Sequence, residues 1–376
     1  MPALTETNQR DDAGTQPTSP PGVTPRPPGE RSLALDAYRG LIMVLLISHG
    51  FGLSALKDHG LGKYLAQQVD HVQWEGLVLW DLIQPAFMFM VGVAMPYAFA
   101  RRGSGGWGGF THALRRSAIL IFLSQLFVAV QASGQFQFGL INVLSQIAFT
   151  YLICFLLMRF DFRVQAAAAV ALLGGHWLLF LAYPGPAGPF SPQGNVGQVI
   201  DQWLLGRNYS GYYVTINLVS STVTTLFGVW AGMLMRRPIA LPQKLRLLLS
   251  WAGGCLAGGL LLSLANPMVK RIWTASFTIY SAGFVLLGLA AMLWLVDGLG
   301  WRRAAMPLVW VGTNSLFIYC VGQMCRGAIW RGIGVFTGKF AWLGTMAGPV
   351  ALDCATLAVM WWMCWWLYQR KAFVKI

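Results

Sequence analysis

His71 and Asp81 are the side chains best suited to catalysis in this sequence, and they lie ten residues apart. His71 stands in residues 70–76, a short segment rich in acidic and aromatic residues, and an imidazole moves protons readily at neutral pH. Asp81 lies about one turn inside an apolar stretch, where an unpaired carboxylate is costly. Because Pro85 cannot donate a hydrogen bond to the carbonyl of Asp81, we expect a kink that leaves acceptors free beside the carboxylate.

Amide and hydroxyl side chains recur in two further apolar stretches. Asn142, Ser145 and Gln146 stand at i, i+3 and i+4, so they share one helix face that must look into the protein. Residues 313–315, Thr-Asn-Ser, interrupt another apolar stretch. Hydrogen bonding between helices is the default role of such groups in a membrane, and lining a substrate site is the alternative.

The elements that must position these residues are membrane helices. Of 376 residues, 56% are apolar and 11% are charged, against about a quarter charged in soluble proteins. Apolar stretches of about 20 residues, long enough to cross about 30 Å of hydrocarbon, recur from Leu33 onward. We predict an all-α integral membrane protein, a polytopic bundle of about ten transmembrane helices at residues 35–56, 77–100, 116–134, 140–158, 165–183, 214–235, 246–264, 274–296, 307–325 and 345–368.

The start of the chain and the basic residues predict the topology. Residues 1–31 are poor in apolar side chains and predict a disordered cytoplasmic tail before a transmembrane domain at 32–376. Nineteen of the 27 basic residues fall on the tail and on the connecting segments of one side. The positive-inside rule therefore predicts cytoplasmic termini in a multi-pass inner or plasma membrane protein. The loops at 57–76, 184–213, 265–273 and 326–344 then face outward.

Other classes of function are disfavoured by the sequence. The net charge of +14 follows from topology, so we expect no nucleic-acid partner. The sequence holds no HExxH pair, no phosphate-cradling glycine loop and no GxSxG elbow, and we expect no metal. No loop is long enough for a soluble catalytic domain, so any chemistry takes place in or at the membrane.

The motifs resemble a known family of membrane enzymes. The pattern His-x-x-Trp-x-Gly at residues 71–76, followed by Asp-Leu-Ile-x-Pro at 81–85, is similar to the transmembrane acyltransferases typified by heparan-alpha-glucosaminide N-acetyltransferase. The resemblance continues in order through residues 35–40, 266–276, 312–316 and 367–376. It implies ten or eleven helices, a homodimer, and transfer of an acetyl group from cytosolic acetyl-CoA to an amino sugar on the other face. His71 occupies the position of the family's active-site histidine, and the arginine topology independently puts it outside.

The resemblance leads to a catalytic hypothesis. We expect His71 to act either as a general base on the acceptor or as a nucleophile that carries the acetyl group, and the sequence leaves both open. We expect Asp81 to orient His71 and to stabilise its cationic form. Asn314 is the expected donor to the oxyanion.

Further residues are expected to bind the two substrates. Arg39, Arg101 and Arg102 are the expected contacts of the acetyl-CoA phosphates, together with the basic C-terminal residues. For the sugar or glycan acceptor, an amine or a hydroxyl, the expected contacts are His49, Trp74, Asn142 and Gln146.

Two functions without acyl transfer remain open. A transporter or a flippase of a small or lipid-linked solute also combines many helices with buried amides and a broken helix. A structural scaffold would use its tryptophans only for packing and for the lipid interface.

Overall fold

The computed structural model describes residues 32–100, 107–131 and 138–374, and these form helices joined by short turns. The predicted tail lies outside the described residues. The α-helices are α1 (Leu33–Ser48), α2 (Gly62–Gln68), α3 (Ile83–Ala100), α4 (Trp107–Gln131), α5 (Val143–Leu157), α6 (Phe162–Ala182), α7 (Val196–Leu205), α8 (Asn217–Arg236), α9 (Leu241–Leu262), α10 (Ala275–Leu293), α11 (Arg302–Thr313), α12 (Ser315–Met324), α13 (Arg326–Thr337) and α14 (Gly344–Gln369). Short 3₁₀ turns are η1 (His49–Leu56), η2 (Leu79–Leu82), η3 (Ser210–Tyr212) and η5 (Gly338–Leu343), and η4 (Trp294–Gly298) is a π-turn.

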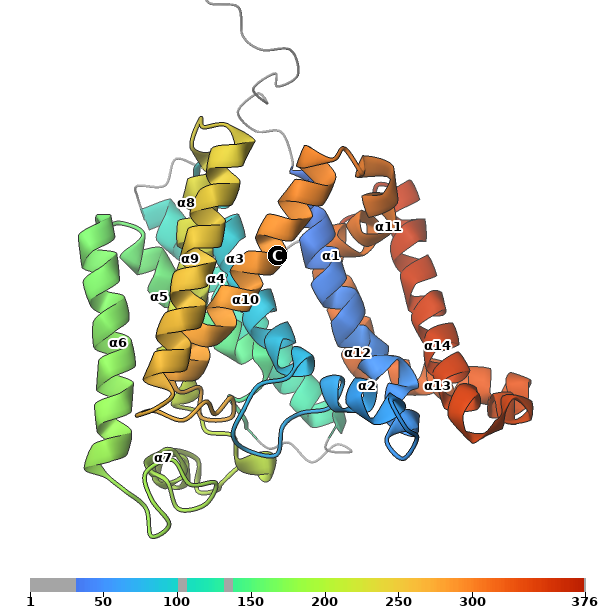
Figure 1. Ribbon diagram of the computed structural model, residues 1–376, viewed down its shortest axis with the longest axis horizontal. Helices are drawn as coiled ribbons and strands as arrows, with labels where there is room; N and C mark the ends of the chain where they lie inside the picture. The colour runs from blue at the N-terminus through green and yellow to red at the C-terminus, as the bar shows by residue number, and fades with distance from the viewer. Residues whose placement is uncertain (1–31, 101–106, 132–137, 375–376) are drawn as a thin grey trace, which may run out of the picture. The chain divides into compact units, whose positions relative to one another are not determined.

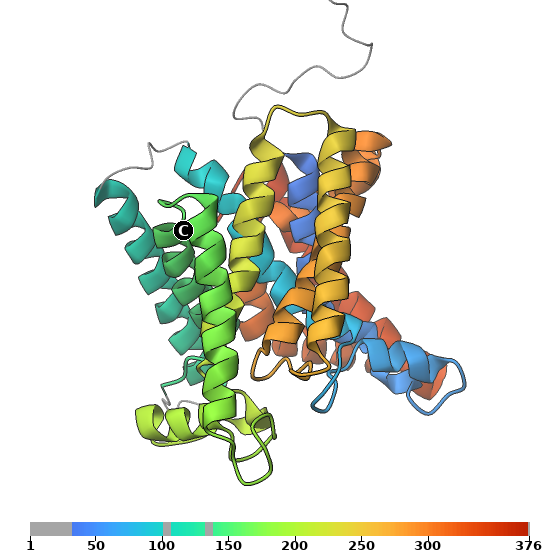
Figure 2. The same cartoon turned by 60° about the vertical axis from the view of Figure 1, so that its left-hand side comes forward.

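The membrane helices agree with the apolar stretches of the sequence. Within the described residues, eight helical segments are long and apolar enough to span a bilayer. The bent pair α11 and α12 gives a further span, and the shorter apolar α5 occupies the stretch predicted at 140–158. The all-α polytopic bundle is thereby confirmed (Figures 1 and 2).

Glycines let the central helices approach closely. A Cβ on Gly92 of α3 would lie 2.0 Å from the carbonyl oxygen of Thr225 in α8, and one on Gly228 would lie 2.0 Å from that of Phe89. The same contact joins α1 and α11, where Gly312 faces the backbone of Asp36. Small residues at such crossings allow backbone contact between membrane helices. The backbone of α3, which continues from η2 and Asp81, is therefore fixed by α8.

The helical bundle has two ends that matter for function. At the upper end in Figure 1 α1 begins, α8 turns into α9, α10 turns into α11 and α14 finishes, and we call this the basic end. Its turns and helix ends carry the arginines Arg236, Arg237, Arg302, Arg303 and Arg370. At the opposite end lie the segment between α1 and α3 and the turn between α9 and α10, and we call this the His71 end. Leu33, at the start of α1, and Phe373, after α14, line one cavity at the basic end. The start of α1 and the segment after α14 therefore meet there.

One local expectation is wrong. Pro85 lies in the first turn of α3, directly after η2, where a helix needs no backbone donor, so it does not kink the span. Three of the predicted outward loops are partly helical, since they contain α2, α7 and α13. Those helices are short and partly polar, so no apolar stretch of spanning length marks them in the sequence.

The predicted interruption at residues 313–315 is confirmed. The chain bends by 65° between α11 and α12. Asn314 stands at the bend with φ −118° and ψ 33°, outside the helical region. The amide of Asn314 is fully buried there.

Candidate active site

Three ionisable side chains from distant parts of the chain meet at the His71 end. Nδ1 of His71 lies 2.7 Å from Oδ1 of Asp81, and Nζ of Lys270 donates to the same oxygen at 3.3 Å. The Asp81 side chain is 1% exposed, that of Lys270 is 6% exposed, and that of His71 is 40% exposed. A buried carboxylate therefore holds a partly exposed imidazole on one side and a buried ammonium on the other.

The hydrogen bonds define which imidazole nitrogen is available for chemistry. Ionised Asp81 can only accept hydrogen bonds, so His71 donates through Nδ1–H. Nε2 then keeps its lone pair. A histidine held in this tautomer by a carboxylate can take a proton from a substrate or attack a carbonyl carbon.

Backbone contacts hold the His71 segment against neighbouring loops. The backbone N–H of Val78 donates to Oδ2 of Asp81 at 3.4 Å. Gly76 N–H donates to the carbonyl of Met268 at 2.9 Å, and Nε1–H of Trp74 donates to the carbonyl of Phe190 at 2.8 Å. The segment is thus tied to both the α9–α10 turn and the α6–α7 connection.

Lys270 lies in the motif at residues 266–276, but only the structure brings it to His71 and Asp81. The turn that carries it is internally bonded: Asn266 Oδ1 accepts from the backbone of Ser276 at 3.1 Å, and Thr274 Oγ1 accepts from that of Val269 at 3.0 Å. Burial lowers the pKa of Lys270, and the adjacent Asp81 carboxylate partly opposes this shift. A lysine between apolar and amide residues in so short a turn is the signal that the sequence offers.

A chain of amides lies one turn further along α3 from Asp81. Nε2 of Gln84 donates to Oε1 of Gln146, whose own Nε2 donates to Oδ1 of Asn217 at 2.8 Å and to Oγ of Ser221 at 3.3 Å. Gln146 is buried and faces the bundle, as the helical spacing predicts. Asn142 instead caps α5, because its Oδ1 accepts from the backbone of Leu144 at 2.9 Å.

His49 lies at the His71 end. It terminates α1 in the left-handed conformation, with φ 48°. The following Gly50 packs against Val69, two residues before His71, where a Cβ would be 2.9 Å from that of Val69. Nearby, Arg326 and Asp353 form an ion pair at 2.5 Å, and both lie within electrostatic reach of His49.

The α6–α7 connection and α7 cover the same end of the bundle. Val196 of α7 packs in a small apolar cluster with Val214, Val269 and Trp74. Asp201 of α7 is fully buried, and both of its carboxylate oxygens lie 3.1 Å from the backbone N–H of Thr215. Burial raises the pKa of Asp201, and the hydrogen bonds from Thr215 partly oppose this shift.

Asn314 is not brought to His71. It follows Gly312, which contacts the first turns of α1, and its Oδ1 accepts from the backbone of Val374 at 3.3 Å. From Asp36 to Gly50, α1 rises roughly 20 Å, so Asn314 and His71 lie near opposite ends of α1. The Nδ2 of Asn314 has no hydrogen-bond partner among the described residues.

A cavity of about 400 Å³ lies at the basic end beside Asn314. Its walls come from the start of α1, from α11 and from the C-terminal segment: Leu33, Asp36, Val309, Thr313, Tyr368, Gln369, Lys371 and Phe373. Arg39, one turn along α1, pairs with Asp36 at 3.3 Å. Arg101 and Arg102 lie outside the described residues.

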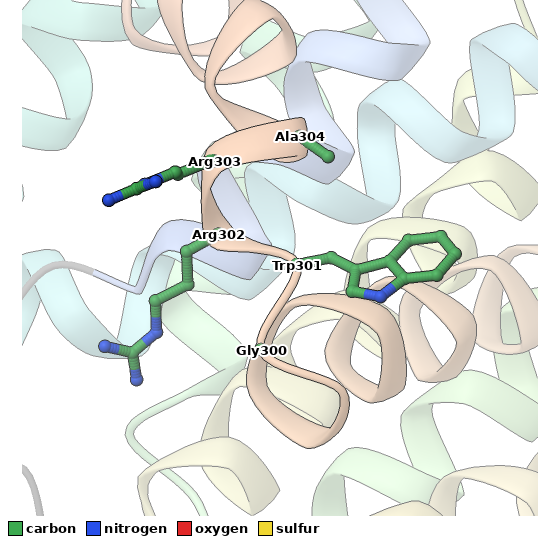
Figure 3. A pocket seen from close by; sticks show the side chains of 5 residues that line it. All are labelled: Gly300, Trp301, Arg302, Arg303 and Ala304. Carbon is green, nitrogen blue, oxygen red and sulfur yellow. The ribbon is translucent and has the colours of Figure 1, made fainter.

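A second hollow, of about 610 Å³, lies where α10 turns into α11. Figure 3 shows Arg302 and Arg303 extending together on one side of the turn and Trp301 on the other. Two guanidinium groups at the start of a helix form a strongly cationic surface.

Comparison with known proteins finds a distant similarity to an acetyltransferase. No protein-family model matches it. The sequence is 24% identical over 424 aligned positions to heparan-alpha-glucosaminide N-acetyltransferase of Mus musculus. The match covers 94% of this chain and 62% of that protein, so the chain spans about three fifths of its relative. The chain is therefore a polytopic membrane protein with a distant relationship to an acetyltransferase family.

Proposed function

We propose that this protein is a membrane acyltransferase that moves an acetyl group from acetyl-CoA at the basic end to an amine or hydroxyl of a sugar at the His71 end. The observation that carries the proposal is the partly exposed imidazole of His71, bonded through Nδ1 to buried Asp81 with Nε2 left for chemistry. The distant acetyltransferase relationship supports the reaction class.

The proposed chemistry follows one of two routes from Nε2 of His71. As a general base, Nε2 takes the proton of the acceptor amine or hydroxyl while that atom attacks the thioester carbonyl, and coenzyme A leaves as the thiolate. As a nucleophile, Nε2 attacks the thioester carbonyl, the carbon–sulfur bond breaks and coenzyme A leaves as the thiolate; the acceptor then attacks the acetyl carbon, the carbon–Nε2 bond breaks, and Nε2 takes the acceptor's proton. In both routes, ionised Asp81 stabilises the positive charge on the imidazole.

The basic end supplies a suitable donor site. The cavity beside α1 has Lys371 in its wall, and Arg39 follows one turn along the same helix. Arg302 and Arg303 add cations at the neighbouring turn (Figure 3). Phosphate groups of acetyl-CoA bind best to such clusters, and the sequence adds Arg101 and Arg102. In this proposal α1 connects the donor cavity to the His71 segment, against which Gly50 packs.

The acceptor is proposed to bind at the His71 end. Trp74 belongs to the His71 segment, and His49 adjoins Gly50, which packs against Val69 beside that segment. Both residues therefore remain the proposed acceptor contacts. Gln146 is fully enclosed by other amides, and its proposed role is to shape the floor of the site. Asn142 acts as a helix cap and contributes through the position of α5.

The test is acetyl transfer by the purified protein in lipid nanodiscs, with acetyl-labelled acetyl-CoA and a panel of amino sugars and neutral glycosides. We expect His71→Ala to reduce transfer by about a hundredfold or more, as removal of a general base or nucleophile does. His59→Ala is the matched control, because His59 is an exposed histidine on the same connection. Equal rates in wild type and His71→Ala would refute the proposed role of His71.

A transporter remains a second candidate because of the break between α11 and α12. The buried Nδ2 of Asn314 at a 65° bend is a feature that transporters use to bind solutes. Movement of a labelled glycoside across proteoliposomes without any loss of acetyl-CoA would favour this function over acyl transfer.

A further inference from the structure

An aromatic surface lies next to His71 and is built from two loops. The ring of Tyr212 stands edge-on to that of Trp74, with centroids 6.2 Å apart and planes at 90°. Trp74 follows His71 by three residues, and its indole N–H is already bonded to Phe190. Tyr212 is 37% exposed. Its ring is therefore accessible next to Trp74, three residues along the chain from the partly exposed His71.

Tyr212 is held in a backbone conformation that tyrosine rarely adopts. Its φ is 62°, and that of the preceding Gly211 is 73°. A left-handed conformation is unfavourable for a residue that carries a side chain. The hydroxyl of Tyr212 accepts from Nε2 of Gln193 at 3.3 Å, and Nη1 of Arg271 donates to the Gly211 carbonyl at 2.9 Å. These contacts hold the strained residue next to Trp74, and strain of this kind accumulates at ligand sites.

Arg271 brings a positive charge to the same surface. It follows Lys270, its guanidinium lies 5.8 Å from the ring centre of Tyr213, and it forms no ion pair with a carboxylate among the described residues. Tyr213 is within electrostatic reach of both Arg271 and Asp81, which links this surface to the active site. One N–H of Arg271 bonds Gly211, and a guanidinium has further donors for an anion.

The position of Arg271 in the fold indicates the source of an anion that its guanidinium could bind. It lies in the short turn between the spanning helices α9 and α10, four residues before Ala275 begins α10. Such a turn lies at the bilayer surface, at the depth of lipid phosphates. Tyr212 likewise lies near the start of the apolar segment Ser210–Arg236, which contains α8. An aromatic face for a sugar ring and a cation for a phosphate are thus combined at the membrane boundary.

We propose that Trp74, Tyr212 and Arg271 form an acceptor subsite for a glycosyl phosphate carried on a lipid, with the sugar against Tyr212 and the phosphate at Arg271. The inference rests on the proposed acyltransferase function, because it orients a sugar hydroxyl or amine towards Nε2 of His71. The lipid chain remains in the bilayer.

Direct binding tests the subsite without any turnover. The His71→Ala protein in phosphatidylcholine nanodiscs is titrated with hexyl glucosyl phosphodiester, hexyl glucoside and hexyl phosphate, and tryptophan fluorescence is followed. We expect the phosphodiester to bind most tightly. Arg271→Gln should weaken both phosphate ligands about tenfold and leave hexyl glucoside unchanged. Tyr212→Ala should weaken both glucosyl ligands, whereas Tyr212→Phe should retain most of the affinity.

Arg207→Gln is the matched control, since Arg207 is another arginine of the His71 end that donates to a carbonyl, that of Phe138. Equal affinities in Arg271→Gln and the control would overturn the proposal. So would equal binding of hexyl phosphate and the phosphodiester with no effect of Tyr212→Ala, which would indicate a lipid headgroup site. Binding as expected without acetyl transfer by wild type would refute the proposed function and leave the subsite standing.

Discussion

Asp81 accepts hydrogen bonds from His71 and Lys270 on a single carboxylate oxygen, at 2.7 Å and 3.3 Å. Lys270 also lies 3.3 Å from Nδ1 of His71. Because an ammonium group shares the carboxylate charge, Asp81 can remain ionised in a buried position. The three residues therefore act as one electrostatic unit, and changes to them should not be additive.

The first prediction separates charge balance from catalysis. Asp81→Asn leaves the Lys270 ammonium buried without its counter-charge, and we expect a loss of about 3 kcal/mol in unfolding free energy together with loss of acetyl transfer. Adding Lys270→Met should restore much of the stability and none of the activity. Thermal unfolding and transfer rates are measured for wild type, the two single variants and the double variant. Full additivity of the stability changes would contradict the shared electrostatic unit.

The second prediction concerns the helix that follows Asp81. Gly92→Ala puts a Cβ 2.0 Å from the Thr225 carbonyl, so α3 must move away from α8. We expect a loss of about 1–3 kcal/mol and a lower transfer rate. Gly174→Ala in α6 is the control, because a Cβ there meets no atom within 4 Å. The two variants are compared by Tm and by kcat, and an unchanged Gly92→Ala protein would argue against close packing of α3 on α8.

The third prediction concerns pH and Asp201. Its pKa is raised in the folded state, so the folded protein binds this proton more tightly than the unfolded chain. The contribution of Asp201 to stability is greatest below its ordinary pKa and declines as the pH rises through the raised value. The Tm of wild type relative to that of Asp201→Asn should therefore fall as the pH rises through that window. Glu75→Gln, at an exposed carboxylate of the same end, should show no comparable trend; a wild-type Tm that rises with pH relative to Asp201→Asn would contradict the prediction.

The fourth prediction tests the amides below the site. Gln146→Leu leaves Gln84 and Asn217 without a partner, which should cost about 1–3 kcal/mol. If Gln146 only shapes the floor, Gln146→Glu should raise the acceptor KM less than Gln146→Leu, because it still accepts from Gln84 although it no longer donates to Asn217. Measuring KM and Tm together distinguishes a shaping role of Gln146 from direct acceptor binding. In direct binding, both variants would raise KM alike.

The helices could be predicted from sequence because a bilayer imposes a minimum apolar length, and the break at Asn314 could be predicted because polar residues interrupt one stretch. The positions of α2, α7 and α13 could not, since short helices at a membrane surface need no continuous apolar run. Pro85 was misinterpreted because the sequence does not show where α3 begins, and proline is acceptable in a first turn.

The site was predictable only in part for a similar reason. His71 and Asp81 lie close in sequence, and their motif indicates a pair. Lys270 meets them through tertiary structure alone, across 189 residues from Asp81. The residue type of Asn314 predicts a place in the site, but backbone packing of Gly312 on α1 keeps Asn314 at the basic end.

The distance in sequence between Asp81 and Lys270 also affects biosynthesis. The ribosome releases α3 long before the turn between α9 and α10 exists, so the nascent chain carries a carboxylate whose cationic partner has not been made. Until then Asp81 must stay in contact with water or hold a proton, since an unpaired charge cannot remain in lipid. Insertion of the α9–α10 hairpin is thus the step at which Asp81 can first settle as a buried anion. Chains that stop before it should be retained by membrane quality control.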